Sequence, residues 1–257
     1  MNVMELFSLK GKTAIITGGG RGLGEQIATG FAEAGANLVL CSRKQEACEE
    51  VAEKIRGLGV KALALKCDIS NPEDVQNVIQ KTVEEFGGID ILVNNSGATW
   101  GAPAEEMPLE AWNKVINVNV TGTFLMSQAA GRVMIEQRRG KIINISSVAG
   151  LGGTDPRVMN TIGYNTSKGA VITLTKDLAV KWGPHNINVN AIAPGFFPTK
   201  MSKVIIKHGK NPILESTPLR RFGSEDDLKG AALFLASDAS NYVTGDVLIV
   251  DGGTHAM

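Results

Sequence analysis

Short apolar runs and longer segments of helical periodicity alternate along the whole 257-residue chain. The short runs are rich in β-branched and aliphatic residues and nearly continuous in apolar character, which favours strands buried on both faces. We expect strands at residues 13–17, 37–41, 61–65, 89–93, 141–145, 187–191 and 246–250. Helical patterns separate them at residues 22–34, 44–57, 72–86, 108–138, 162–182 and 224–236. Asn71-Pro72 and Ser224 are expected to begin the third and the last of these helices.

The alternation of strand and helix predicts an α/β fold, a Rossmann-type doubly wound parallel sheet of about seven strands with helices on both faces. No proline-rich, serine-rich or charged linker divides the sequence, and it contains no internal repeat. We therefore expect a single domain over residues 1–257, with a cofactor half at about 9–150 and a catalytic and substrate half at about 151–257. A lid over the substrate is expected at about residues 200–221.

Charge and cysteine content exclude several functional classes. The chain has 26 basic and 26 acidic residues, so it lacks the basic excess of surfaces that bind nucleic acids or anionic membranes. Cys41, Cys48 and Cys67 lack metal-ligand spacing and the three histidines are scattered, so we expect reduced thiols and no metal site. No apolar run approaches the roughly 18 residues of a membrane span, and residues 1–10 lack a targeting pattern. These features predict a cytoplasmic protein.

A glycine cluster lies at the first predicted strand-to-helix turn. Its spacing, Gly18-x-x-x-Gly22-x-Gly24, differs from the Gly-x-Gly-x-x-Gly fingerprint of dinucleotide-binding proteins. Glycine permits a tight backbone there and lets amides approach a pyrophosphate at the helix N-terminus. The turn is therefore expected to bind a dinucleotide through Gly18, Arg21, Gly22, Leu23 and Gly24.

The residues at the ends of the second and third strands bear on the choice of cofactor. A carboxylate about twenty residues beyond the glycine cluster would bind the ribose diol of NAD, but this chain has Ser42 and Arg43 there. Arg43 and Arg21 offer guanidinium groups to a 2′-phosphate, which predicts NADP(H); two solvated arginines are the alternative. Asp68, followed by Ile69, is expected to face the adenine or to cap the exit of the third strand.

Polar residues follow the fourth and fifth strands, whose carboxyl ends border the ligand crevice of such a sheet. Asn94-Asn95-Ser96-Gly97 and Ser146-Ser147 are therefore expected to project toward one crevice, where a serine hydroxyl can hold a substrate carbonyl. Asn117 and Asn119 are unusual polar residues in a mostly apolar helix. Asn119 is placed to order a water molecule beside Lys168, unless it bonds to the helix backbone locally.

Tyr164 and Lys168, four residues apart on one predicted helix, share a helix face. A phenol with its ordinary pKa of about 10 is hardly ionised at neutral pH. An ammonium group beside it favours the ionised form and makes the phenol usable as an acid or a base. The only other tyrosine in the sequence, Tyr242, has no such partner. The pair suggests hydride chemistry on a bound nicotinamide.

These motifs, in this order, resemble the short-chain dehydrogenase/reductases over essentially the whole chain. The resemblance implies that Tyr164 donates or accepts a proton and that Ser147, rather than Ser146, polarises the carbonyl. It implies that Lys168 holds the nicotinamide ribose and lowers the pKa of the phenol, and that Asn119 anchors a proton-relay water. It also implies cofactor contacts by Asn95, Ser96, Gly97, Tyr164, Lys168, Pro194, Gly195, Phe197 and Thr199.

The chain departs from the family pattern at two places. Ser96 replaces the alanine that usually follows the two asparagines, a small change that we expect to be tolerated. The stretch from Ser147 to Tyr164 is a few residues longer than is common and carries residues 154–160. This insertion is expected to line the substrate rim, which weakens any transfer of substrate identity from relatives.

Two substrate classes fit the resemblance. We slightly favour a 3-oxoacyl thioester or a similar ketone, because carrier-protein reductases use basic positions near the active-site mouth that match Arg138 and His185. The alternative is a gluconate 5-dehydrogenase-like activity on sugar acids, because residues 7–12 and 194–199 resemble those of gluconate 5-dehydrogenase relatives. The predicted lid is basic, with Lys203, Lys207, His208, Lys210, Arg220 and Arg221. A basic lid favours an anionic substrate, and a solvated helix face is the alternative explanation of the same charges.

A non-catalytic dinucleotide sensor or scaffold is a third possibility. The intact tetrad of Asn119, Ser147, Tyr164 and Lys168 argues against it, because a disrupted tyrosine or lysine would be its sequence signature. The resemblance further implies a homotetramer with two-fold axes, formed through the helices at 108–138 and 162–182 and the terminal strand.

Overall fold

All seven predicted strands are present in the computed structural model, which describes residues 2–199, 202 and 212–257. Their bounds are β1 (Thr13–Thr17), β2 (Asn37–Ser42), β3 (Ala62–Lys66), β4 (Ile91–Asn94), β5 (Gly140–Ile145), β6 (Ile187–Pro194) and β7 (Val247–Val250). They form one parallel sheet in the order β3-β2-β1-β4-β5-β6-β7. The predicted fold class is confirmed, and the strand ends differ from the prediction by up to three residues.

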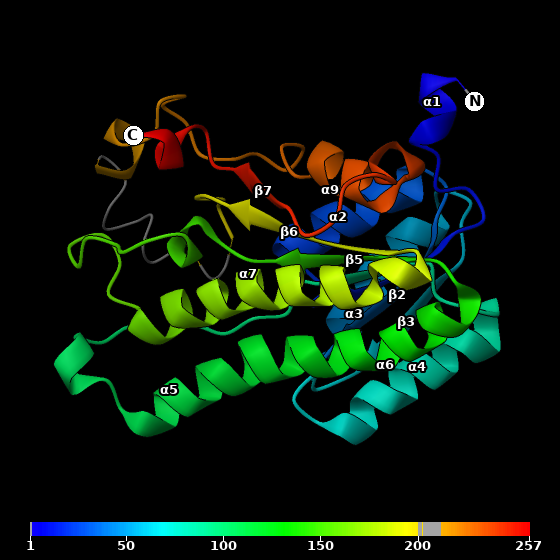
Figure 1. The fold of residues 1–257 in the computed structure, drawn as a ribbon, viewed down its shortest axis with the longest axis horizontal. Helices are drawn as coiled ribbons and strands as arrows, with labels where there is room; N and C mark the ends of the chain where they lie inside the picture. The colour runs from blue at the N-terminus through cyan, green and yellow to red at the C-terminus, as the bar shows by residue number, and fades with distance from the viewer. Residues whose placement is uncertain (1, 200–201, 203–211) are drawn as a thin grey trace.

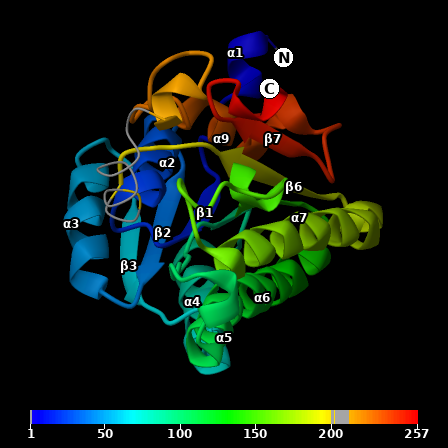
Figure 2. The same ribbon diagram turned by 90° about the vertical axis from the view of Figure 1, so that its left-hand side faces the viewer.

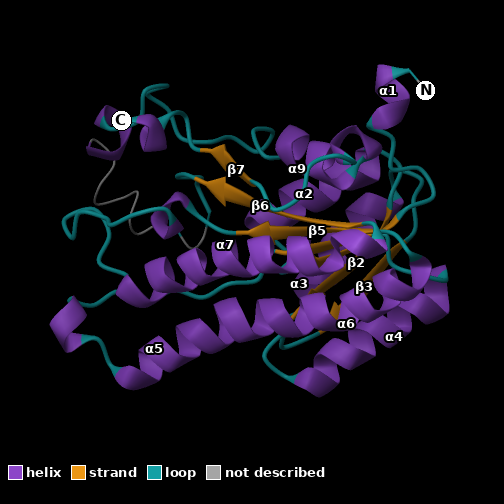
Figure 3. Cartoon of the chain, in the orientation of Figure 1, coloured by secondary structure: helices purple, strands orange, loops and turns teal. Residues whose placement is uncertain are grey.

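Helices cover both faces of the sheet, which is the orange layer in Figure 3. One face carries α2 (Gly22–Glu33), α3 (Gln45–Arg56) and α9 (Lys229–Ala236). The other face carries α4 (Pro72–Phe86), α6 (Gly122–Gln137) and α7 (Ile162–Trp182), with α5 (Leu109–Ile116) leading into α6 (Figures 1 and 2). Successive strand residues point to opposite faces, so Ile15 and Ile16 of β1 enter different hydrophobic cores. A short helix, α1 (Val3–Leu6), precedes the sheet.

The sheet reverses its strand order between β1 and β4. From β1 the chain proceeds to β2 and β3 on one side, and then continues from β4 to β7 on the other. The loops that leave β1 and β4 therefore diverge at the carboxyl edge of the sheet, where ligands bind in folds of this kind. This topology places the glycine turn after β1 opposite the polar loop after β4.

Two predicted helices need correction. The last one begins at Lys229 with Leu228 as its N-cap, so Ser224 does not cap it. The amide and hydroxyl of Ser224 instead donate to the carboxylate of Asp227, which turns residues 224–228 into a loop before the helix. The predicted helix at 108–138 is interrupted by a π-helical segment, Asn117–Thr121, between α5 and α6. Such wide turns insert one residue and are frequent at functional sites.

The remaining expectations concern metals, thiols and membranes. Cys41, Cys48 and Cys67 are buried free thiols. Among the residues that the structure describes, no cluster of three or more His, Cys, Asp or Glu is arranged to hold a metal ion. In that same part of the chain, no helix is long and apolar enough to cross a bilayer.

Candidate active site

The glycine turn after β1 forms a cradle that side chains would fill. Gly18 and Gly22 have φ angles of +66° and +57°, which favour glycine. A Cβ atom on Gly24 would lie 2.3 Å from the carbonyl oxygen of Gly18 and 2.5 Å from Nδ2 of Asn95. The N-terminus of α2 receives no side-chain cap from Arg21, so its first amides are left for another acceptor.

Thr17 joins this turn to the loop after β4. Its Oγ1 accepts hydrogen bonds from the amides of Asn95 and Ser96, each at 3.0 Å. Nδ2 of Asn95 donates in return to the carbonyl oxygens of Thr17 and Gly18, at 2.9 and 3.2 Å. Thr17 was not predicted as a site residue. Its position at the end of β1, directly before the glycines, is the sequence feature that could have identified it.

Arg21 and Arg43 are both exposed, and neither forms an ion pair with any residue in the described part of the chain. Arg43 follows β2, and its charge acts on Asp68, which follows the neighbouring β3. Two free guanidinium groups and a cradle without Cβ atoms fit the phosphates of a dinucleotide, including one on the ribose 2′-oxygen.

The other predicted residues at this edge have local partners. Ser42 donates through Oγ to the carbonyl of Lys44 at 2.8 Å and so shapes the turn that presents Arg43. The hydroxyl and amide of Ser70 both donate to Asp68 and hold the pKa of this carboxyl below its ordinary value. The side chain of Ile69 is buried against Gly122, so only its backbone faces the site.

The segment after β6 crosses back toward the glycine turn. Gly195 donates to the carbonyl of Val250 at 3.0 Å. Further along, Cγ2 of Thr199 lies 3.5 Å from the position that a Cβ on Gly22 would take. Phe197 does not point its ring at the crevice, because the side chain is buried in the core against Gly223. A cofactor contact at Phe197 is therefore limited to its backbone.

The structure distinguishes the two serines after β5. Oγ of Ser146 is buried and donates to the carbonyl of Lys168 at 2.9 Å, so it is committed to holding α7. Oγ of Ser147 accepts from the amide of Ala149 at 3.2 Å, and its hydroxyl lowers the pKa of Tyr164. Ser147 is thus the hydroxyl that lies beside the phenol.

Lys168 lies one helical turn beyond Tyr164, as the spacing predicts. Its Nζ is 5.5 Å from the centroid of the phenol ring and donates to the carbonyl of Ile145 at 2.6 Å. Burial lowers the pKa of Lys168 to about 8, which leaves the amine protonated at neutral pH. Burial also raises the pKa of Tyr164, and the nearby hydroxyl of Ser147 offsets only part of that rise.

The predicted lowering of the Tyr164 pKa by Lys168 is outweighed in this structure by the effect of burial. Desolvation of the phenolate outweighs the favourable contacts of the phenol, so the pKa lies above its ordinary value. Tyr164 is protonated near neutral pH, which suits a proton donor.

Asn119 lies in the π-helical segment and is buried. Its Oδ1 accepts from the amide of Ala98 at 2.7 Å, and its Nδ2 donates to the carbonyl of Ala98 and to Oγ of Ser167. Ser167 in turn donates to the carbonyl of Tyr164 at 2.7 Å. The side chain of Asn119 thus connects the loop after β4 to the helix that carries the phenol. Ser167 is a further site residue that the sequence analysis missed.

The expectation that Asn94 projects into the crevice is wrong. Asn94 is buried, and its Nδ2 donates to Oγ of Ser127 at 2.9 Å and to Oδ1 of Asn144 at 2.8 Å. Alternation along β4 turns this side chain toward the helix layer, whereas Asn95 follows the strand end and reaches the glycine turn. Gly97 lies beside the tetrad, since a Cβ there would be 3.5 Å from Oδ1 of Asn119 and 3.9 Å from Nζ of Lys168.

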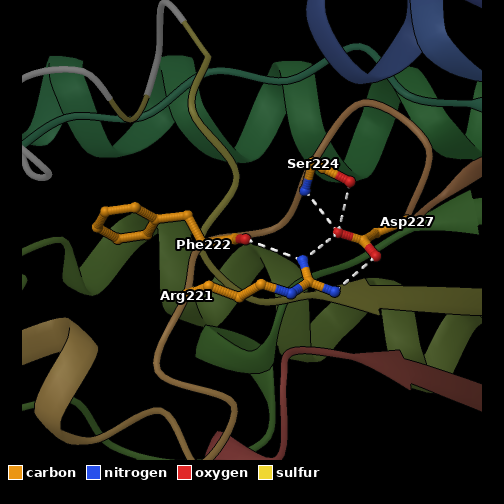
Figure 4. Close-up of polar contacts among 4 residues, drawn as sticks. All are labelled: Arg221, Phe222, Ser224 and Asp227. Carbon is orange, nitrogen blue, oxygen red and sulfur yellow. Dashed lines mark hydrogen bonds and ion pairs between the residues drawn. The ribbon is translucent and has the colours of Figure 1, made fainter.

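Residues 200–201 and 203–211 of the predicted lid lie outside the described residues, and with them Lys203, Lys207, His208 and Lys210. The two described arginines of the lid have local partners. Arg220 donates to the carbonyl oxygens of Leu214 and Glu215. Arg221 binds Asp227 with two nitrogens, at 2.5 and 2.9 Å, and also contacts the carbonyl of Phe222 (Figure 4). Asp227 neutralises the charge of Arg221, whereas Arg220 bonds only to carbonyl oxygens and keeps its charge.

Arg138 and His185 do lie together, but not at the mouth of the site in this chain. Nη1 of Arg138 is 3.2 Å from Nδ1 of His185, and Nη2 donates to the carbonyl of Pro184. Both residues follow the C-terminal ends of their helices, while Tyr164 lies near the N-terminus of α7 (Figure 1). At 1.5 Å per residue, the length of α7 separates them from Tyr164 by about 27 Å.

Curated relatives cover almost the whole chain. A family model described as "Enoyl-(Acyl carrier protein) reductase" matches residues 18–255. The 5-keto-D-gluconate 5-reductase of Escherichia coli (strain K12) is 39% identical over 97% of this chain and 97% of its own length. The 3-oxoacyl-[acyl-carrier-protein] reductase FabG of Aquifex aeolicus is 40% identical over 95% of this chain and 98% of its own length.

Solved structures give the same result. A short-chain type dehydrogenase/reductase from Mycobacterium marinum superposes with a TM-score of 0.95 at 39% identity, covering 98% of this chain and 99% of its own. A gluconate 5-dehydrogenase from Burkholderia cenocepacia, solved in complex with NADP and tartrate, superposes with a TM-score of 0.94 at 37% identity over the full length of both chains. The chain therefore belongs to the short-chain dehydrogenase/reductase family of oxidoreductases, as its motifs predicted.

Proposed function

We propose that this protein is an NADP(H)-dependent oxidoreductase that interconverts a ketone and a secondary alcohol. The observation that carries this proposal is the convergence of Ser147, Tyr164 and Lys168 beside the loop that is bonded to the glycine turn. The nicotinamide, when bound, supplies or accepts the hydride. A substrate carbonyl would accept hydrogen bonds from the hydroxyls of Ser147 and Tyr164, and the protonated phenol would deliver the proton that the new alcohol requires.

Lys168 supports this step through its charge. The amine lies beside the phenol ring and stabilises the negative charge that develops on the phenol oxygen when its proton leaves. Its position near Gly97 also suits the predicted contact with the nicotinamide ribose. Asn119 holds the helix turn of Tyr164 through Ser167, and its predicted role as the anchor of a relay water is part of this proposal.

The choice of NADP(H) over NAD(H) rests on Arg21 and Arg43. Both are exposed near the glycine turn and the end of β2, where an acidic residue would bind the ribose of NAD. A guanidinium group binds a phosphate through two parallel hydrogen bonds. The similar gluconate 5-dehydrogenase that was solved with NADP supports the same choice.

For the substrate, we now favour a polyhydroxy keto acid of the 5-ketogluconate type over an acyl thioester. The position of Arg138 and His185 at the far end of α7 removes one reason for expecting a carrier-linked substrate in this chain. The 5-keto-D-gluconate reductase and the gluconate 5-dehydrogenase structure are similar along their whole length. The 3-oxoacyl reductase is equally similar, so an acyl thioester is the second candidate.

Initial rates with a substrate panel test this proposal. Purified protein is mixed with NADPH or NADH and with 5-ketogluconate, acetoacetyl-CoA or a small diketone, and cofactor oxidation is followed by absorbance. Preference for NADPH with 5-ketogluconate is the expected result. Preference for acetoacetyl-CoA moves the assignment to acyl reduction, and silence with every ketone favours the non-catalytic sensor.

We also propose that the protein assembles as a homotetramer in the cytoplasm. Large apolar side chains on the predicted interface helices are exposed, among them Phe124 on α6 and Val180 on α7. The three buried free thiols are typical of a reducing compartment. Light scattering that gives the mass of a single 27.2 kDa chain at working concentration would contradict the tetramer.

A further inference from the structure

The insertion that distinguishes this chain lies in a loop whose two ends meet at the reacting groups. We call residues 151–160 the rim. It follows Ser147 through a short 3-10 turn at Val148–Gly150 and ends just before α7, which carries Tyr164. Because the hydroxyl of Ser147 lies close enough to Tyr164 to lower the pKa of the phenol, the rim leaves and returns at the place where the substrate carbonyl would bind. The chain connections at its two ends therefore place the rim beside the carbonyl site.

The side chain of Asn165, next to the phenol, holds the rim at both ends. Its Nδ2 donates to Oγ1 of Thr154 at 3.0 Å, and its Oδ1 accepts from Oγ1 of Thr161 at 3.0 Å. Thr154 also donates to the carbonyl of Met159 at 3.1 Å, which closes the rim on itself. The amide of Asn165 suits this position because it donates to one end and accepts from the other.

Thr161 shows that this arrangement displaces a more usual one. It is the N-cap residue of α7, where a threonine hydroxyl normally accepts a hydrogen bond from a helix amide. Here the cap has no side-chain bond, and the hydroxyl donates to Asn165 instead. The stabilising contribution of a side-chain cap is therefore absent at the helix that carries the phenol.

A backbone contact fixes the same end of the rim to the loop after β4. The amide of Ala102 donates to the carbonyl of Asn160 at 3.0 Å, and Ala102 and Thr161 form a parallel bridge. The middle of the rim is exposed, and its Arg157 is bonded to Asp155, so the two opposite charges are paired with each other. The rim is thus tied at its base and neutral at its tip.

We propose that Asn165 is a positioning residue that fixes the rim as a wall of the substrate pocket and so sets the preference for an extended substrate. This inference rests on the proposed carbonyl chemistry of Tyr164. A fixed wall presents constant contacts to the far end of a six-carbon keto acid, whereas a small diketone is too short to touch it. Loss of the hydrogen bonds of Asn165 should therefore raise KM for the keto acid and leave the kinetics of diketone reduction unchanged.

Two readouts on four variants test the proposal. Asn165→Ala and Thr154→Ala each remove the tether, their combination tests whether the two side chains act together, and Thr166→Ala is the control. Thr166 is exposed on the same helix turn and makes no side-chain hydrogen bond among the described residues. The first readout is KM and kcat for 5-ketogluconate, or for acetoacetyl-CoA if that is the substrate, beside those for the diketone. The second is the rate of tryptic cleavage after Arg157, identified by mass spectrometry.

We expect Asn165→Ala and Thr154→Ala to raise KM for the long substrate about tenfold, as the loss of one or two hydrogen bonds permits. The diketone values and the pH profile are expected to change less than about twofold, because Tyr164 keeps its neighbours. Cleavage after Arg157 is expected to accelerate in both variants and in their combination by similar factors, but not in Thr166→Ala.

Equal losses with both substrates together with a shifted pH profile would overturn the proposal in favour of a general role in holding α7. Unchanged cleavage after Arg157 would overturn the tether itself. If the wild-type protein is silent with every ketone, the proposed function fails, while the proteolysis still decides whether Asn165 fixes the rim.

Discussion

The glycine turn follows β1 and the rim follows Ser147 after β5, and the two segments are held by opposite means. In the turn, the decisive feature is the lack of side chains, since a Cβ on Gly24 would collide with the Gly18 carbonyl at 2.3 Å. In the rim, the decisive feature is a set of side-chain hydrogen bonds centred on Asn165. A close backbone approach tolerates almost no substitution, whereas hydrogen bonds at a surface each contribute about 1 kcal/mol and are easily rearranged.

This difference suggests a division of labour within the fold. The cofactor half accommodates one fixed ligand with backbone geometry that depends on glycine. The substrate half uses short polar side chains on a loop, which allow the pocket to differ between members that share the same tetrad. It follows that changes in the turn should affect every substrate alike, while changes in the rim should affect substrates selectively.

The largest effect is expected from Tyr164→Phe, which removes the hydroxyl and keeps the ring. Reduction of every ketone should slow about a thousandfold, because the phenol of Tyr164 is the group next to Ser147 that is proposed to deliver the proton. NADPH affinity, measured by cofactor fluorescence, should change little. Tyr242→Phe is the matched control, because that phenol is fully exposed. Substantial activity in Tyr164→Phe would refute the proposed mechanism.

Gly24→Ala should distort the glycine turn and weaken cofactor binding. The new methyl group would force the Gly18 carbonyl or Asn95 to move, and we expect a loss of about 1–3 kcal/mol in the free energy of unfolding and much weaker NADPH binding. Gly230→Ala is the control, because that helical glycine is exposed and has open space around it. It should stabilise the fold by about 0.5–1 kcal/mol. Thermal melts of both variants, with and without NADPH, provide the measurement.

A smaller and more selective effect is expected from Arg43→Ala. Loss of one guanidinium group opposite a 2′-phosphate should raise KM for NADPH about tenfold and leave KM for NADH nearly unchanged. Lys44→Ala removes a neighbouring exposed charge and serves as the control. Equal effects on NADPH and NADH in Arg43→Ala would show that the side chain does not recognise the extra phosphate.

The smallest effect concerns two buried lysines at opposite ends of β5. Lys141 is the second residue of the strand, Lys168 bonds to the carbonyl of its last residue, and burial lowers the pKa of each lysine to about 8. The folded chain releases these protons near pH 8, whereas a free lysine does so near pH 10.4. Between these values the unfolded chain binds more protons, so the free energy of unfolding rises with pH.

Lys141→Met should reduce that rise by about 1 kcal/mol between pH 8 and pH 10, as measured by urea denaturation. The variant leaves the catalytic edge untouched, since Lys141 bonds only to Ser240 among the described side chains. An identical rise in both proteins would mean that Lys141 is not desolvated as the structure indicates.

Much of this arrangement follows from local sequence rules. The strands are apolar runs bounded by polar or glycine residues, and Asn71-Pro72 caps α4 as expected, with Oδ1 of Asn71 accepting from the amide of Glu73. The errors occur where a specific side-chain partner, near or distant in the chain, decides. Ser224 bonds to Asp227, which Arg221 also holds, and the predicted cap is lost. Asn94 turns inward because Ser127 and Asn144 receive its amide.

The sequence by itself determined the strand and helix order, the glycine turn and the Tyr164–Lys168 pair, because each depends on residue type at short spacing. The tertiary structure decided what long-range contacts and burial control. It committed Ser146 to the backbone of Lys168 and moved Arg138 and His185 away from the site. It also raised the pKa of Tyr164, because desolvation depends on which atoms surround the phenol and not on the residues that adjoin it in the chain.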